Sequence, residues 1–530
     1  MLQNKLHKYP GSGIVILLFL AGMYLVPLRI TGFGMDYIPG DKGDSRFNNY
    51  VLEHGHRFLA GKEDSFWTAP FMFPQEKNIA LSDNLLGTLP VYSFFRMLGT
   101  DKETAFQWWF VTMFVFNFFA AWFSLYKITG NKTGAALGAF VFAFSMPVIA
   151  QINHVQLLPR FAIPLCFYFL IYFLRTLHPL HFAGFVLMLT WQFYCGMYLG
   201  FLLLLAIVFF LFIAAFLLIP WKKLFRQDYR FWLKITGLTV FALLVIYPLA
   251  GPYLETVSQI GYRDFEKEIV PGLPRVLSHF YSVNDSILWN SLSTTGDYLP
   301  YPWEHRIFAG AISWLCLAVI TIMAFKARKT ENGKLMIVFV LTLFLLGLIS
   351  LFAFGDTLYK LVLYFPGFGS MRILTRIIFV MLFFFSAAIA FSFLLLEEKF
   401  HLQRNVVLGA SVIAALLVVA DQYVSEKSYM RFSKAEAQQQ IAFTQSKIAL
   451  AIQPRHKIVA LMPRETADVN HLQLDAMLAC QEMDLKCVNG YASSAPGSFG
   501  LFWWKPCNEH LDIWLKEKGF TDTTAVLRLY

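Results

Sequence analysis

The chain has 530 residues, of which 57% are hydrophobic and 17% aromatic, while only 15% are charged. Soluble globular proteins carry about 25% charged residues, so this composition excludes a soluble protein and indicates an integral membrane protein. The formal net charge of +10 comes largely from Lys and Arg beside apolar stretches. It reports orientation in a membrane, and no nucleic acid is expected as a partner.

Long apolar stretches recur along the chain. A helix needs about 20 predominantly apolar residues to span a bilayer. On this basis the sequence predicts an all-α polytopic membrane protein with about eleven transmembrane helices. Their ranges are 13–30, 104–126, 133–150, 156–174, 180–195, 199–219, 234–252, 307–325, 335–354, 374–396 and 404–421.

The connections between these helices differ in charge. Lys and Arg gather in alternate connections, such as 220–234 and 326–334, and are scarce in the others. Connections rich in Lys and Arg remain in the cytoplasm. We therefore expect a cytoplasmic N-terminus and, after an odd number of spans, an extracytoplasmic C-terminus. The expected location is the bacterial cytoplasmic (inner) membrane.

Three segments are predicted to lie outside the cytoplasm. They are the loops 31–103 and 253–306 and the tail 423–530. The tail alternates helix-like and strand-like stretches, which predicts a small C-terminal α/β extracytoplasmic domain after a transmembrane domain over 1–422. In that oxidising compartment we expect two of Cys480, Cys487 and Cys507 to form a disulfide, with Cys480 and Cys487 as the preferred pair.

The first outer loop opens with an acidic turn, Gly-Asp-Lys-Gly-Asp-Ser-Arg at residues 40–46. Two carboxylates three residues apart in a glycine-rich turn can converge on one hydroxyl or one cation. Asp41 or Asp44 is therefore a candidate catalytic base, and Asp44 is preferred because it is closer to the helix that follows. The alternative is that these residues simply build a surface turn.

A predicted helix follows this turn. Asn49, Glu53 and His56 fall at i, i+4 and i+7, so they share one polar face that could line a pocket. With Arg46 at the start of the helix, they are candidates for contacts with substrate. The alternative reading is a solvated face.

Basic residues mark the outer ends of two spans. Arg372 and Arg376, at the start of the tenth, are expected to share a helix face and to bind a phosphate together with free backbone amides. Arg160 and His154, at the outer end of the fourth, are further candidates for substrate binding. The alternative is that the arginines extend to lipid head groups.

Taken together, these features resemble the GT-C superfamily of membrane glycosyltransferases, with an architecture like that of protein mannosyltransferases. The resemblance rests on the first span, the long outer loop with its acidic pair, and the C-terminal outer domain. It also rests on an interfacial helix ending in Phe95-Arg96-Met97-Leu98-Gly99 and a second span closed by Tyr126-Lys127-Ile128-Thr129-Gly130. It implies a sugar carried on a polyprenyl phosphate, transferred outside the cytoplasm with Asp41 or Asp44 as the base.

The chain also departs from the superfamily's patterns. Its acidic pair is Asp-x-x-Asp, whereas several branches have adjacent or one-apart acidic residues. The Trp-Trp-Asp-Tyr-Gly signature of oligosaccharyltransferases is missing, because Trp503-Trp504 is followed by Lys505-Pro506. Transfer of a whole oligosaccharide to Asn is therefore not expected.

The predicted function is transfer of a sugar from a polyprenyl-phosphate donor to an envelope lipid, glycan or protein acceptor, with membrane lipids as further partners. A divalent cation, Mg or Mn, is optional because two arginines could neutralise the leaving phosphate. The alternatives are a lipid or polysaccharide transporter or flippase and a noncatalytic envelope assembly protein. Transport usually requires ionisable groups near the bilayer midplane, and the central parts of these spans contain no Asp, Glu, Lys or Arg.

Overall fold

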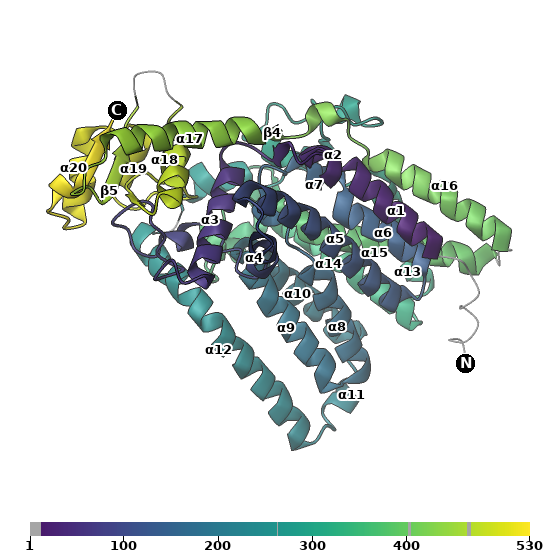
Figure 1. Ribbon diagram of the computed structural model, residues 1–530. Helices are drawn as coiled ribbons and strands as arrows, with labels where there is room; N and C mark the ends of the chain where they lie inside the picture. The colour runs from purple at the N-terminus through teal and green to yellow at the C-terminus, as the bar shows by residue number, and fades with distance from the viewer. Residues whose placement is uncertain (1–11, 262, 401–403, 464–467) are drawn as a thin grey trace.

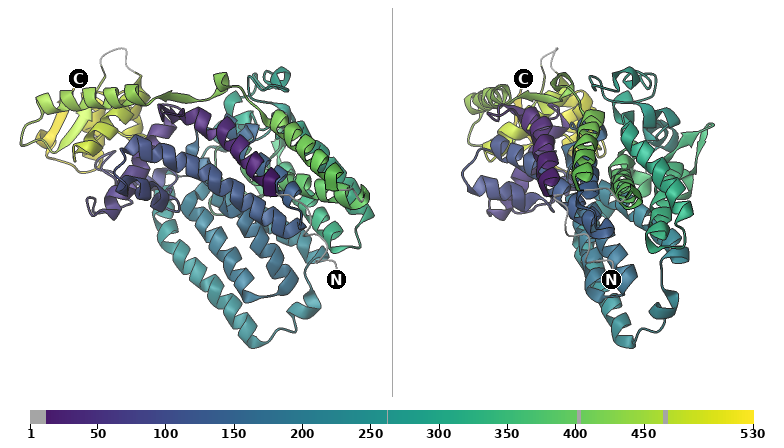
Figure 2. Two further views of the ribbon diagram at one scale, coloured as in Figure 1. Left: turned by 45° about the vertical axis from the view of Figure 1, so that its right-hand side comes forward. Right: turned by 90° about the vertical axis from the view of Figure 1, so that its right-hand side faces the viewer.

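The computed structural model describes residues 12–261, 263–400, 404–463 and 468–530. Long helices run side by side in a bundle, and a smaller unit that contains a β-sheet lies at one end of it (Figures 1 and 2). A helix occupies each of the eleven apolar ranges. These helices are α1 (Ser12–Leu25) with α2 (Pro27–Thr31), α5 (Lys102–Thr129), α6 (Lys132–Phe144) with α7 (Met146–Ala150), α8 (Ala162–Thr176), α9 (Pro179–Cys195), α10 (Met197–Leu217), α12 (Tyr229–Ile260), α13 (Ala311–Lys326), α14 (Glu331–Ser350), α15 (Ile378–Phe400) and α16 (Arg404–Gln422).

Eight helical segments of the described residues are long and apolar enough to cross a membrane. The segment of α6 and α7 and that of α15 are each 94% buried and form the centre of the bundle, whereas α12 is only 6% buried and lies at its edge (Figure 1). A helix that is apolar on all sides and still exposed within the protein is one that faces lipid. The structure therefore supports an integral membrane protein.

Two glycines bring the central helices into close contact. A Cβ atom on Gly138 would lie 2.4 Å from the backbone oxygen of Ser386, and one on Gly134 would lie 2.7 Å from that of Ala390. Larger side chains would therefore push α6 and α15 apart. Small residues four apart commonly allow such close packing between helices in membranes.

The first outer loop folds against the end of the bundle. It contains α3 (Asp44–Leu59) and the shorter α4 (Leu89–Met97). Helix α4 corresponds to the predicted interfacial helix that ends in Phe95-Arg96-Met97-Leu98-Gly99. A short strand before α3, β1 (Tyr37–Pro39), pairs antiparallel with β4 (Arg431–Ser433) of the tail. The sequence did not predict this pair, because three residues are too few to show an alternating pattern.

The tail forms a small α/β unit. Its sheet has three parallel strands in the order β6–β5–β7, which are β6 (Lys486–Cys487), β5 (Ile458–Leu461) and β7 (Val526–Leu529). The helices are α17 (Lys434–Ala451), α18 (Val469–Glu482), α19 (Phe499–Trp504) and α20 (Asn508–Glu517). Cys480 and Cys487 are both buried, but all six cysteines are free thiols, so the predicted disulfide is not present.

The tail and the first outer loop share one hydrophobic core. Phe47, Tyr50 and Val51 of α3 belong to the same buried cluster as Leu474 and Met477 of α18. A buried ion pair between Arg46 and Asp475 joins the same two helices. The acidic turn at the start of α3 is therefore held by the bundle on one side and by the tail on the other.

We expect Arg46→Ala to lower the free energy of unfolding by about 3–5 kcal/mol, because it leaves the buried carboxylate of Asp475 without its partner. Replacing both residues by Met and Leu should cost less, since no buried charge remains. Thermal unfolding of the detergent-purified protein measures the change. The matched control is Arg528→Ala, whose pair with Asp512 is 27% and 54% exposed and should contribute about 1 kcal/mol or less. Equal losses in the two variants would contradict a special role for the buried pair.

Candidate active site

Asp44 lies where three distant segments meet. Its Oδ2 is 2.6 Å from Nδ1 of His154, which lies in the connection between α7 and α8. Its Oδ1 accepts a hydrogen bond of 2.7 Å from the hydroxyl of Tyr491 in the tail. The side chain of Asp44 remains 24% exposed. The structure thus places this predicted residue on an accessible surface and fixes both of its oxygens.

The contacts continue beyond His154 into the bundle. Nε2 of His154 is 2.9 Å from Oε1 of Glu304, and Nη2 of Arg376 donates a 3.0 Å hydrogen bond to the same oxygen. Glu304 and Arg376 each belong to a single turn of 3-10 helix, Pro302–His305 and Leu374–Ile377. We call Asp44, His154, Glu304 and Arg376 the charge chain, because acidic and basic side chains alternate along it.

The charge chain fixes the protonation of its members. Burial and the charge of Arg376 lower the pKa of His154, but Glu304 and Asp44 outweigh them and raise it to about 9. Burial raises the pKa of Asp44, yet the hydrogen bonds from His154 and Tyr491 bring it below its ordinary value. Burial likewise opposes the charge of Glu304, but Arg376 and His154 hold its pKa well below the usual range. At neutral pH the imidazolium therefore lies between two carboxylates.

Asp41, the other candidate base, has different surroundings. Burial and the neighbouring charge of Asp44 raise its pKa. Its Oδ1 accepts hydrogen bonds from the backbone amides of Gly43, at 3.1 Å, and Ser45, at 3.3 Å. Its Oδ2 accepts none from the described part of the chain. Of the two carboxylates, Asp41 is therefore the more basic and has the freer oxygen.

Arg372 and Arg376 do not act as predicted from their spacing. Helix α15 begins only at Ile378, after the 3-10 turn Leu374–Ile377, so the two arginines do not share a helix face. Arg376 is buried in the charge chain, whereas Arg372 is exposed and has no hydrogen bond or ion pair to any described residue. Burial and Asp44 raise the pKa of Tyr491, and the charge of Arg372 is close enough to oppose this rise. Arg372 therefore lies at the rim of the site.

Arg160 is not a substrate contact in this structure. It is fully buried, and its Nη2 donates to the backbone oxygens of Phe142, at 2.7 Å, and Ala143, at 3.3 Å. These carbonyls belong to the last turn of α6, where they lack partners within the helix. The guanidinium therefore stabilises a helix C-terminus.

The polar face of α3 points away from Asp44. Residues nine positions apart on a helix lie about half a turn from each other, so Asp44 and Glu53 are on opposite faces. Glu53 accepts two hydrogen bonds from Arg96, at 2.8 and 3.0 Å, and Asn49 accepts one from Tyr92 at 3.3 Å. These predicted substrate contacts instead join α3 to α4.

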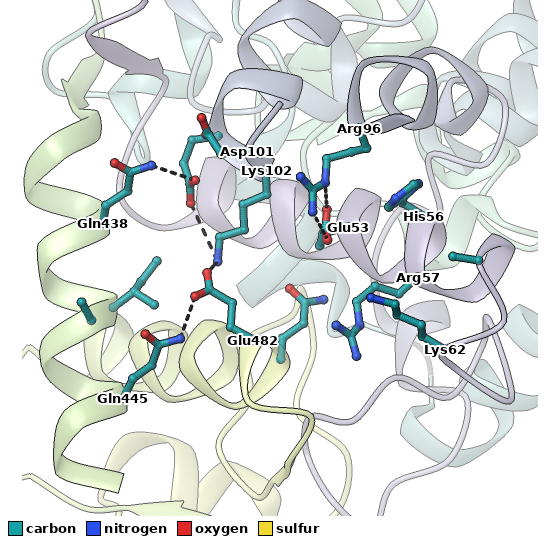
Figure 3. A pocket seen from close by; sticks show the side chains of 15 residues that line it. Glu53, His56, Arg57, Lys62, Arg96, Asp101, Lys102, Gln438, Gln445 and Glu482 are labelled. Atoms are coloured by element: carbon teal, nitrogen blue, oxygen red, sulfur yellow. Dashed lines mark hydrogen bonds and ion pairs between the residues drawn. The ribbon is translucent and has the colours of Figure 1, made fainter. Parts of the chain in front are cut away.

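A separate hollow of about 590 Å³ lies on that side. Glu53 and His56 line it, facing residues of α17 and α18 (Figure 3). Some of its charged groups pair across it: Lys102 bonds to Glu482, and Arg96 bonds to Glu53 (Figure 3). The predicted pocket therefore exists, but the acidic turn is not among the residues that line it. Arg46 is likewise engaged elsewhere, in its pair with Asp475.

Sequence reasoning missed three residues of the site. Glu304 contacts His154, which is 150 positions away in the sequence, and Tyr491 contacts Asp44, which is 447 positions away. No spacing in the sequence reveals such contacts. Asp83 is a further carboxylate. Burial raises its pKa, and the charge of Arg376 partly opposes this rise. Asp83 accepts a 3.3 Å hydrogen bond from the amide of Tyr198. No motif in the first outer loop marks it.

The charge chain does not fit a divalent cation as it stands. Within the described ranges, no three His, Cys, Asp or Glu side chains are grouped so that they could hold a metal ion. Both oxygens of Asp44 accept hydrogen bonds from protein groups, and two of the four members of the chain are basic. The expected Mg or Mn remains a prediction.

The fold of this chain is similar to those of solved glycosyltransferases. An oligosaccharyltransferase from Archaeoglobus fulgidus in the apo form aligns with a TM-score of 0.53 over 96% of this chain and 69% of its own, at 10% identity. Archaeal AglB from Archaeoglobus fulgidus, in complex with an inhibitory peptide and a dolichol-phosphate, aligns with a TM-score of 0.51 over 97% and 69%, also at 10% identity. Arabinofuranosyltransferase AftD from Mycobacteria aligns with a TM-score of 0.50 at 14% identity, over 86% of this chain and 29% of AftD.

These likenesses show the fold. The oligosaccharyltransferase and AftD are GT-C superfamily members, so the predicted resemblance to GT-C proteins is confirmed at the level of the fold. This chain spans less than a third of AftD. No protein-family model matches the sequence, and a search of curated proteins finds no match.

We expect stability to fall between pH 6.5 and 9 because of His154. Its pKa is about 9 in the folded protein and about 6.5 when unfolded. The stabilisation is therefore complete below pH 6.5 and is lost as the pH rises through 9; it amounts to about 3 kcal/mol at most. Thermal unfolding across this range measures it.

The fall should be absent in His154→Gln, which cannot become charged. It should persist in the control variant His471→Gln, because that histidine's side chain is 43% exposed and lies outside the charge chain. A pH dependence that is unchanged in His154→Gln would show that another group causes it.

Proposed function

We propose that this protein is a membrane glycosyltransferase that uses a polyprenyl-phosphate sugar. The observation that carries the proposal is a partly exposed pair of carboxylates, Asp41 and Asp44, fixed by a buried charge chain at one end of a GT-C bundle. One solved neighbour of the same fold is a complex with a dolichol-phosphate, which is a polyprenyl phosphate. The acceptor belongs to the lipids, glycans or proteins of the cell envelope.

The chemistry follows from the different surroundings of the two carboxylates. Asp41 takes the proton of an acceptor hydroxyl as that oxygen attacks the anomeric carbon of the donor. The new carbon–oxygen bond forms while the bond from the anomeric carbon to the phosphate oxygen breaks, and the polyprenyl phosphate leaves. Asp44 holds the turn in place through His154 and Tyr491. The sequence favoured Asp44 as the base, whereas this proposal gives that role to Asp41.

The leaving phosphate needs positive charge. Arg372 is exposed at the rim without a described partner, so its guanidinium is free to pair with the phosphate. Arg376 already bonds to Glu304 and contributes by keeping the charge chain in place. A divalent cation stays optional in this scheme.

The proposal includes the position of the chain in its membrane. The eleven helices cross a bacterial inner membrane with the N-terminus in the cytoplasm. The acidic turn, the loop 253–306 and the tail then lie outside; α3, which follows the acidic turn, lies beside the tail at one end of the bundle (Figure 1). A donor in the outer leaflet and an acceptor from the envelope meet there.

We expect Asp41→Asn and Asp44→Asn each to reduce sugar transfer by about 10²–10⁴-fold. The former loses the base, and the latter loses the carboxylate that fixes the turn. Transfer from a radiolabelled polyprenyl-phosphate sugar pool to extracted envelope acceptors measures the rate. Asp36→Asn, an exposed acid in the same loop, is the control.

The pH profile separates the two roles. In the wild-type protein the rate of sugar transfer should fall at acidic pH as Asp41 becomes protonated. This fall should disappear in Asp41→Asn, whose residual rate no longer depends on ionising that base. Asp44→Asn should keep the fall at reduced amplitude. Full transfer by the double variant would contradict a catalytic role for the turn.

We expect Arg372→Ala to weaken use of the donor by about ten- to more than a hundredfold, because a charge-assisted contact is worth about 1.5–3 kcal/mol. Arg372→Lys should recover only part, since an ammonium keeps the charge but loses the planar fork. The control is Lys360→Ala, which removes an exposed cation paired with Asp356. Donor KM values compare the variants, and equal values for Arg372→Ala and Lys360→Ala would exclude Arg372 as the phosphate contact.

A further inference from the structure

A groove of about 800 Å³ lies in the tail beside the acidic turn. One face of α17, including Glu436, Gln440 and Phe443, forms one wall, and the first turns of α18, including His471 and Asp475, form the other. Its volume lies within the range of about 300–1,000 Å³ typical of sites for small molecules. It is therefore large enough to bind a ligand of several rings.

The groove sits at the place in a parallel sheet where ligands usually bind. Leu461 and Met462, at the carboxyl end of β5, line it together with Tyr530, directly after β7. Strand β5 is in the middle of the sheet: the next strand in the sequence, β6, lies on one side of it, and the last strand, β7, lies on the other. The carboxyl ends of strands at such a switch point form a crevice.

The charges of the groove balance. Lys42, Arg46 and Lys447 are positive, and Glu436, Asp468 and Asp475 are negative. With three charges of each sign, the groove has no excess charge that would select an anionic or cationic ligand. Arg46 pairs with Asp475 and Lys42 with Glu436, and such a balance of donors and acceptors suits a neutral ligand that has many hydroxyl groups.

Amides and aromatic rings complete the lining. Gln439 and Gln440 offer both donors and acceptors. Phe443 and Tyr530 are 54% and 51% exposed. The ammonium of Lys447 lies over one face of the Phe443 ring, 4.4 Å from its centroid, and the exposed ring surface is available to the apolar face of a sugar ring. This combination favours an oligosaccharide over a lipid chain or a nucleotide.

One buried polar atom in the groove lacks a partner. Arg46 is only 6% exposed, and its Nε has no hydrogen-bond partner among the described residues. A buried donor left unpaired costs about 1–3 kcal/mol. Arg46 also lines the groove, so this unpaired donor lies just beneath the groove's surface.

The groove reaches the acidic turn at Lys42, which lies between Asp41 and Asp44 in the sequence; neither carboxylate lines the groove. Arg46, two residues after Asp44 in α3, also lines it. A ligand that extends along the groove toward Lys42 therefore approaches the turn.

We propose that this groove binds the acceptor and that the acceptor is a neutral oligosaccharide whose terminal ring reaches Asp41. The inference rests on the proposed function and names its acceptor class. The rings of the acceptor pack on Phe443 and Tyr530, and their hydroxyls bond to the amides and the paired charges.

Saturation-transfer NMR on the full-length protein in nanodiscs tests the inference. The probes are neutral linear oligosaccharides of mannose, glucose, galactose or arabinose, together with matched oligosaccharides that carry uronates, and unstructured peptides. We expect binding of neutral oligosaccharides above the other two classes. Phe443→Ala should weaken this binding by about three- to tenfold. The matched control is Leu450→Ala, because Leu450 is 89% exposed on the same helix and outside the groove.

Each outcome decides one point. The inference is wrong if no neutral oligosaccharide binds, if peptides or uronates bind equally well, or if Phe443→Ala, still folded by its thermal unfolding, binds as wild type does. Asp41→Asn separates the inference from the proposed function. It should keep oligosaccharide binding while losing transfer. Transfer retained in Asp41→Asn, with binding in the groove intact, would overturn the catalytic role of Asp41 and leave the groove as a glycan site.

Discussion

The alternation of charge from Asp44 through His154 and Glu304 to Arg376 is the constraint on which the rest of this structure depends. Taking an ion out of water costs several kcal/mol, and only a partner with good geometry offsets the cost. Here each inner member touches a neighbour of opposite sign. Removing His154 therefore leaves Asp44 without its oppositely charged partner, and removing Glu304 does the same to Arg376.

The charge chain also joins parts of the fold that are distant in sequence. It links the start of α3, the connection after α7, the loop before α13 and the entry to α15, and Tyr491 adds the tail. The core shared by α3 and α18 also holds α3 against the tail. The acidic turn is consequently held from both sides, and Asp44 is presented in a fixed geometry.

Burial and the neighbouring charge of Asp44 raise the pKa of Asp41, and among the described residues its Oδ2 has no hydrogen-bond donor. In the proposed mechanism, the turn divides two tasks between carboxylates three residues apart: Asp44 holds the geometry and Asp41 accepts a proton. The same proposal assigns the donor phosphate to Arg372 and the acceptor to the groove that reaches Lys42.

The sequence by itself determined the helices of the bundle, the α/β character of the tail and the acidic turn, because hydropathy, periodicity and glycine-rich spacing are local properties. Only the tertiary structure decided which side chains meet. Glu304 and Tyr491 reach the charge chain from far along the chain, Arg160 turns to the carbonyls of α6, and Glu53 faces Arg96 rather than the turn. Arg372 and Arg376 were separated for a similar reason: a 3-10 turn precedes α15, and packing rather than local propensity sets where a helix begins.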